Sequence, residues 1–111
     1  MRNVTVAAIQ MSIPETPEKS VEKAEKLVRK AAAEGANVIL LPELFENWYF
    51  CQERRYDSYK LAVPLEENPA VRRFQTVAKE LSVVLPISFY EQDGNVLYNS
   101  VAMIDADGSV M

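Results

Sequence analysis

Residues 37–45 read Asn37-Val38-Ile39-Leu40-Leu41-Pro42-Glu43-Leu44-Phe45. The four consecutive apolar residues that precede Pro42 are typical of a strand that is buried on both faces. Because proline has no backbone N–H for the ladder, Pro42 ends this strand. Glu43 then places a carboxylate at the carboxyl end of a buried strand, beside apolar groups that limit its solvation. Open α/β sheets bind ligands at this end, although spacing alone favours the simpler interpretation that Glu43 opens a solvated loop.

The composition of the chain is that of an ordinary soluble protein. Its 111 residues are enough for one domain, and they are 49% hydrophobic and 25% charged. The net charge of −4 argues against a nucleic-acid partner and against an anionic membrane, because both favour a basic surface. The Arg54-Arg55 and Arg72-Arg73 pairs lie near acidic residues and are expected on solvated helix faces.

The rarest residue types exclude several kinds of site. The chain has no His and one Cys, so it contains neither a Cys/His zinc site nor a Ser-His-Asp triad. We expect no metal and no cofactor. A single Cys forms no internal disulfide, which fits a reducing, cytoplasmic location. The N-terminal residues lack the apolar stretch of a signal peptide, so we expect none, and we expect no membrane span because no apolar run is long enough.

The first third of the chain predicts a strand, a helix and a second strand. Residues 4–10 are β-rich and apolar and predict an interior strand. Thr16 is expected to cap a helix that has Pro17 at its first position and ends near Gly35. Because the links to the strand at 38–41 are short, the two strands should be parallel.

Residues 46–67 form a long connection that contains the cluster Trp48-Tyr49-Phe50-Cys51. Long connections inside compact domains are often functional, but a cluster that only packs against the end of the sheet fits equally well.

The second half of the chain repeats the same signals. Asn68 and Pro69 predict the start of a helix, and residues 83–89 predict a third strand. Pro86 within it requires either a bulge or a ladder position that needs no N–H. Asp93-Gly94 is a strong hairpin signal, so residues 96–104 should pair antiparallel with the third strand.

The end of the chain carries a second turn signal, Asp105-Ala106-Asp107-Gly108. The strands at 38–41 and 101–104 are apolar on both faces, yet only two amphipathic helices are present to cover them. If both helices lie on one face, the other face is a bare hydrophobic sheet, which usually marks an interface. We therefore expect the chain to be the front part of a larger fold, or to associate through this face.

Several segments resemble a known enzyme family, the nitrilase-type carbon–nitrogen hydrolases. The superfamily pattern is carried by Val6-Ala7-Ala8-Ile9-Gln10-Met11, Glu34-Gly35-Ala36 and Leu40-Leu41-Pro42-Glu43-Leu44-Phe45. Similarity to the branch of N-carbamoylputrescine amidases is carried by Tyr49-Phe50-Cys51-Gln52, residues 78–89, Tyr98-Asn99-Ser100 and residues 104–108. The resemblance covers essentially the whole chain.

The resemblance implies the N-terminal part, residues 1–111, of a carbon–nitrogen hydrolase domain with a four-layer αββα sandwich. It also implies a Glu–Lys–Cys triad without a cofactor. Glu43 matches the general base of that triad, while the family's Lys and nucleophilic Cys fall beyond residue 111. Cys51 matches a different motif and is expected to pack as a small apolar residue. Tyr49 is a candidate substrate-binding residue, and a packing role fits it as well.

The expected function is therefore that of an amidase, acting on N-carbamoylputrescine or a related amide in cytoplasmic polyamine synthesis. The chain alone should be inactive, because the covalent route needs the nucleophile. The expected partners are a small carbamoyl-amine or amide substrate and either a second copy of the chain or the missing C-terminal half. The alternative is an inactive α/β fragment that serves as an association module. A nucleotide-binding module is disfavoured, because three glycines cannot form a Gly-rich phosphate loop.

Overall fold

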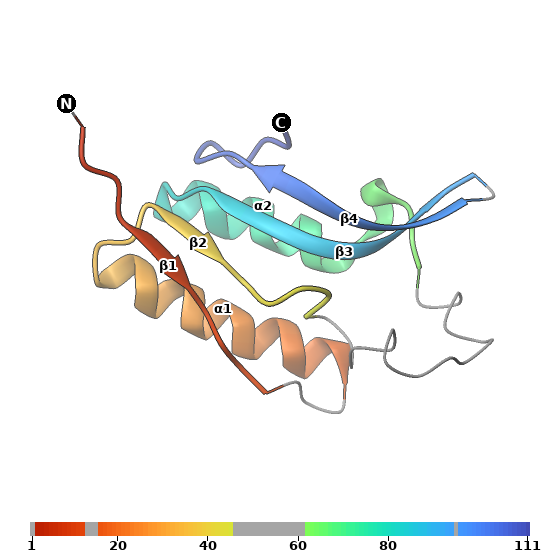
Figure 1. Cartoon of the computed structure of the whole chain (residues 1–111), viewed down its shortest axis with the longest axis horizontal. Coiled ribbons are helices and arrows are strands. Elements are labelled where there is room, and N and C mark those ends of the chain that lie inside the picture. Colours follow the sequence, from red (N-terminus) through yellow and green to blue (C-terminus); the bar gives the residue numbers. More distant parts are fainter. Residues whose placement is uncertain (1, 13–15, 46–61, 95) are drawn as a thin grey trace.

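The computed structural model describes residues 2–12, 16–45, 62–94 and 96–111. The described residues form a mixed α/β structure in which two helices lie on the same side of four strands (Figure 1). In chain order, the elements are β1 (Val6–Ala8), α1 (Pro17–Ala33), β2 (Val38–Leu40), the 3₁₀ helix η3 (Leu65–Glu67), α2 (Pro69–Leu81), β3 (Leu85–Asp93) and β4 (Val96–Ile104). No helix in this part of the chain has the length and apolar character that a membrane span requires.

The strands form two pairs that meet at a single bridge. β1 and β2 are parallel, as predicted, and β3 and β4 form an antiparallel hairpin along their whole length. One parallel bridge, between Val38 and Val84, joins β2 to the segment that leads into β3. Within the described residues β1 pairs only with β2, so the prediction of an interior first strand was wrong for this chain.

Pro86 explains why the contact between the two pairs is short. The N–H of Val84 donates to the carbonyl of Asn37 (2.9 Å), and the carbonyl of Val84 accepts from Ile39 (3.0 Å). In a parallel ladder the next donor on this edge belongs to the residue two positions on, and proline has none. The β3–β4 register runs without a bulge from Leu85 to Asp93. Pro86 therefore occupies a position that needs no N–H on the β4 side.

Local capping starts both helices where the sequence predicts. The side chain of Thr16 accepts a hydrogen bond from the N–H of Lys19 (3.3 Å), and that of Asn68 accepts from Val71 (2.9 Å). A proline follows each cap at the first helical position. These two caps satisfy backbone N–H groups in the first turns of α1 and α2.

The core lies between the helices and one face of the strands. Its larger members come from every main element except β1, and they are Val28, Ile39, Phe45, Val71, Phe74, Val77, Leu85, Ile87 and Ile104. Outside this core, ion pairs join the helices: Arg29 binds Glu80 (2.7 Å) and Arg73 binds Glu25. The guanidinium of Arg73 is the main reason that the pKa of Glu25 lies below its usual value. Arg73 is thus on a solvated helix face beside an acidic residue, as predicted.

The opposite face of the sheet is covered by neither helix. Its residues Val6, Leu40, Val101 and Met103 are 68%, 48%, 59% and 40% exposed. The prediction of a bare hydrophobic face is thus confirmed. The prediction that the strand at 38–41 is buried on both faces was wrong, because Leu40 points away from both helices.

The turn at residues 105–108 is anchored to α2. The N–H of Gly108 donates to the carbonyl of Asp105 (2.9 Å), and Ile104 forms an antiparallel bridge with Val110. The side chain of Gln75 donates to the carbonyl of Gly108 (3.0 Å). Gly108 has a φ of +89°, and a Cβ there would lie 2.8 Å from the backbone oxygen of Gln75. Only glycine fits this conformation and this close approach.

Replacement of this glycine by alanine should lower the free energy of unfolding by about 2–4 kcal/mol, since backbone strain adds to overpacking against α2. The matched control is Gly94→Ala. Gly94 has a φ of +61° but no atom within 4 Å of the added Cβ, so its loss should be about 1 kcal/mol. Urea unfolding followed by circular dichroism measures both values. Equal losses in the two variants would contradict a role for the contact with Gln75.

Candidate functional site

Glu43 lies in the turn that follows β2, at the carboxyl end of that strand. Its side chain is exposed, and the expectation that apolar neighbours limit its solvation was wrong for this chain. The reason is the position of the carboxylate on the face of the sheet that no helix covers. The carboxylate nevertheless contacts protein as well as solvent, because the side chain of Asn99 in β4 donates a hydrogen bond to Glu43 Oε1.

The turn that carries Glu43 is fixed by the residues on its C-terminal side. Leu44 has a φ of +52°, a left-handed conformation that non-glycine residues adopt rarely. Its N–H donates to the hydroxyl of Ser88 in β3 (3.0 Å). The buried carbonyl of Phe45 accepts from the hydroxyl of Ser20 in α1. The ring of Phe45 packs edge-to-face on Phe74 of α2, with centroids 5.7 Å apart.

Asn99 and Ser88 belong to the same uncovered face as the carboxylate. Along β4 the side chains of even-numbered residues near the core are buried, whereas Asn99, Val101 and Met103 are exposed. Ser88 lies opposite Val101 in the register, and its hydroxyl is 3.4 Å from Asn99 Oδ1. Within the described residues Glu43 Oε2 accepts no hydrogen bond, so this oxygen is open to a proton donor from solvent or substrate.

The sequence contained signals for these partners that were not used. Asparagine is disfavoured inside strands, yet Asn99 stands in the middle of β4. Ser88 interrupts the apolar residues of β3, and Ser20 lies on the buried stripe of α1. A polar residue at a position that the pattern assigns to an apolar one is the signal that could have identified all three.

Three other sequence predictions fall outside the described residues. They concern Tyr49, the candidate substrate-binding residue, Cys51, which was expected to pack as an apolar side chain, and the Arg54-Arg55 pair, which was expected on a solvated helix face. All three therefore stay predictions. Among the described residues no group of three or more acidic or Cys side chains is placed to hold a metal ion.

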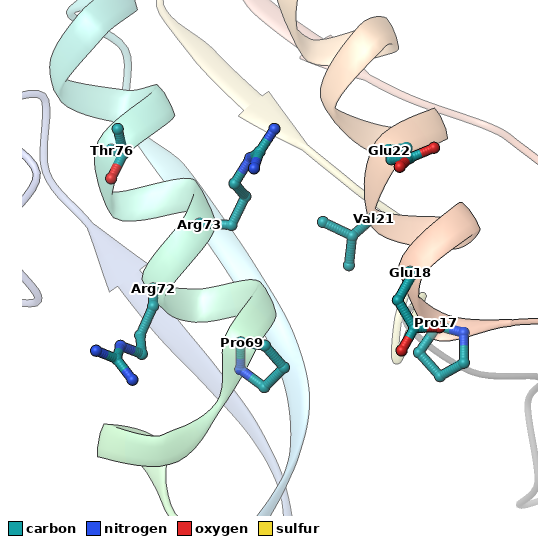
Figure 2. A pocket seen from close by; sticks show the side chains of 8 residues that line it. All are labelled: Pro17, Glu18, Val21, Glu22, Pro69, Arg72, Arg73 and Thr76. Carbon is teal, nitrogen blue, oxygen red and sulfur yellow. The ribbon is translucent and has the colours of Figure 1, made fainter.

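A cavity of about 640 Å³ lies between the N-terminal halves of α1 and α2, on the helix side of the molecule. Figure 2 shows its lining side chains, which are Pro17, Glu18, Val21, Glu22, Pro69, Arg72, Arg73 and Thr76. Glu43 is not among them. The cavity combines acidic residues of α1 with basic residues of α2 and is lined by no residue of the turn that carries Glu43, so it does not belong to the site built around Glu43.

The substitution Ser88→Ala tests how the turn is held. It removes the acceptor of a buried N–H, which should lower the free energy of unfolding by about 1–3 kcal/mol. Ser100→Ala is the matched control on the neighbouring strand, because Ser100 donates to Glu91 (2.7 Å), a carboxylate that water can solvate instead. Chemical denaturation compares the two variants, and a loss for Ser88→Ala no larger than the control would contradict this account.

Comparison with known proteins agrees with this architecture. The family model for carbon–nitrogen hydrolases matches residues 5–111. N-carbamoylputrescine amidase from Oryza sativa is 50% identical over 106 residues, which are 96% of this chain and 35% of that protein. Citrullinase from Francisella tularensis is 42% identical over 111 residues, which are 100% of this chain and 39% of that protein. The chain therefore spans little more than a third of the length of these relatives.

The structural comparison shows a shared fold. The crystal structure of a carbon–nitrogen hydrolase from Helicobacter pylori matches with a TM-score of 0.86 at 24% identity, over 96% of this chain and 37% of that one. A strand that ends in a turn bearing Glu43, a hairpin that reaches this glutamate through Asn99, and a family match over nearly the whole chain lead to one conclusion. The chain belongs to the carbon–nitrogen hydrolase family.

Proposed function

We propose that this chain supplies the general base of an amidase that hydrolyses a non-peptide C–N bond. Glu43, fixed at the end of β2 and bound by Asn99, is the observation that carries the proposal. The proposed substrate is N-carbamoylputrescine, which would yield putrescine, CO₂ and ammonia. The support for this substrate is the 50% identity to the rice N-carbamoylputrescine amidase. Citrulline, a second carbamoylated amine, is the competing substrate that the Francisella citrullinase suggests.

The proposed role of Glu43 is to accept the proton of a cysteine thiol. The resulting thiolate attacks the carbamoyl carbon, a lysine stabilises the tetrahedral intermediate, and ammonia leaves. Water then cleaves the covalent intermediate, and the carbamic acid product loses CO₂. A free carboxylate titrates near ~4.3 and a free thiol near ~8.5. This transfer therefore needs a site that dehydrates the base and places a cation beside the thiol.

Of the three groups in the proposed Glu–Lys–Cys triad, the described part of the chain contains only the proposed base, Glu43. The lysine and the nucleophilic cysteine of the proposed triad match no position within residues 1–111. We therefore propose that these residues act as the N-terminal part of a carbon–nitrogen hydrolase domain, a four-layer αββα sandwich. Its uncovered sheet face would pack against the second sheet. We further propose that the reaction belongs to polyamine synthesis in the cytoplasm.

Glu43→Gln, made in the longest chain that the gene encodes, tests the proposed base. The substitution keeps the size and the hydrogen bond but removes the proton acceptor, so kcat should fall by about 10²–10⁴-fold. Ammonia release from N-carbamoylputrescine and from citrulline is the measurement. The exposed carboxylate of Glu18, on α1, provides the control substitution Glu18→Gln. The 111-residue chain itself should release no ammonia. Activity of Glu43→Gln close to that of the unmodified enzyme would rule out the proposed role.

A second candidate function is association without catalysis. The observation that favours it is the uncovered face, where Val6, Leu40, Val101 and Met103 remain 40–68% exposed. Contiguous apolar surface of this kind commonly marks a site of protein association. In this interpretation the 111-residue chain pairs through the face with a second copy or with the C-terminal part of its own domain.

Sedimentation velocity of the 111-residue chain over a range of concentrations tests this candidate. The unmodified chain should self-associate as its concentration rises, because pairing removes the apolar side chains from water. Val101→Lys places a charge on the face and should shift the chain towards monomer. Thr76→Lys, on the helix side, should not. A chain that stays monomeric at every concentration would exclude association with a second copy.

A further inference from the structure

We infer that Asn99 is a positioning residue for the catalytic base, and that Ser88 fixes the direction in which its amide points. This inference rests on the proposed function, in which Glu43 is that base. It is carried by a continuous set of contacts. The N–H of Leu44 donates to Ser88 Oγ (3.0 Å), Ser88 Oγ is 3.4 Å from Asn99 Oδ1, and Asn99 Nδ2 donates to Glu43 Oε1.

The order of donors in these contacts follows from the chemistry of the serine hydroxyl. A hydroxyl has one proton to donate and lone pairs to accept with. The N–H of Leu44 occupies one lone pair of Ser88 Oγ, and the Ser88 hydroxyl donates its proton to Asn99 Oδ1. An amide that presents its oxygen to Ser88 must present its NH₂ group on the opposite side. The reversed amide would place Oδ1 against the carboxylate, where two acceptors repel.

The same contacts close a ring around the turn. The set of hydrogen bonds begins at the N–H of Leu44 and ends at the carboxylate of Glu43, and these two residues are consecutive. The backbone after Glu43 is thereby bound to β3, and its side chain is bound to β4. An exposed glutamate normally samples several rotamers, but this arrangement holds the carboxylate on the uncovered face in one direction. Correct placement of a reacting group is a large part of catalysis.

The neutral amide has an advantage over a charged partner at this position. A lysine or arginine beside the carboxylate would favour its ionised form and weaken it as a base. Within the described residues the ion pairs of Arg29 and Arg73 go to Glu25 and Glu80, and none reaches Glu43. Asn99 therefore orients the carboxylate without adding a full positive charge to it.

Asn99→Asp in the longest chain that the gene encodes is the principal test, with N-carbamoylputrescine as substrate. The new side chain has the same shape but replaces the donor with an acceptor. We expect kcat to fall about 10–100-fold while KM changes less than twofold. The control is Gln92→Glu, which makes the same amide-to-carboxylate change on the uncovered face of the sheet. Gln92 lies on β3, away from Glu43, so this variant should keep the parental kcat. Asn99→Ala removes the donor without adding charge and should give the same split between kcat and KM.

The double variants separate this inference from the proposed function. In the Glu43→Gln background, adding Asn99→Asp or Asn99→Ala should cause no further loss, because both changes act through the same group. A parental kcat in both Asn99 variants, with an inactive Glu43→Gln, would overturn the positioning role and leave the proposed function standing. Full activity in Glu43→Gln would overturn the proposed function itself. A further loss in the double variants would assign Asn99 a role independent of Glu43 and overturn the inference.

Discussion

The placement of Glu43 depends on the burial of Phe45. This side chain is fully buried against Phe74, and its carbonyl is bound by the hydroxyl of Ser20. Because Phe45 packs on the helix side of the sheet and Glu43 lies on the other side, the chain must cross from one side to the other within two positions. The left-handed conformation of Leu44 makes this reversal possible. The carboxylate is consequently delivered to the uncovered face by packing that lies on the opposite side of the sheet.

The buried polar side chains of the described residues all bind backbone groups that have no partner within a helix or strand. Ser20 binds the carbonyl of Phe45, Ser88 binds the N–H of Leu44, and Asn68 caps α2. Buried backbone groups in turns and in the first turn of a helix require such partners, because leaving one unpaired is costly. Two of these three side chains therefore serve the turn that carries Glu43. The fold uses its few buried polar groups at the site of the proposed chemistry.

The helix caps and the hairpin turn that the sequence predicted correctly depend only on neighbouring residues. Thr16 with Pro17, Asn68 with Pro69, and the turn at Asp93-Gly94 each act within a few positions, and each lies where it was expected. The partners of the Glu43 turn were missed because they are distant in sequence. Ser20 is 25 positions from Phe45, Ser88 is 44 from Leu44, and Asn99 is 56 from Glu43.

Covering the exposed sheet face would change the free energy in two opposite ways, because it would bury the apolar side chains and dehydrate Glu43. Covering the remaining exposed area of Val6, Leu40, Val101 and Met103 would contribute about 3–6 kcal/mol, at ~1.5–3 kcal/mol for each fully buried side chain. Dehydrating one carboxylate costs several kcal/mol. A protein layer laid on this face would therefore offset the dehydration of Glu43 by the burial of its apolar surroundings. A hydrated carboxylate is a weak base for a thiol, so the surface that stabilises such an assembly would also favour the proposed role of Glu43. Asn99, already bound to Glu43 before the face is covered, would keep the carboxylate from losing its last hydrogen bond when water leaves.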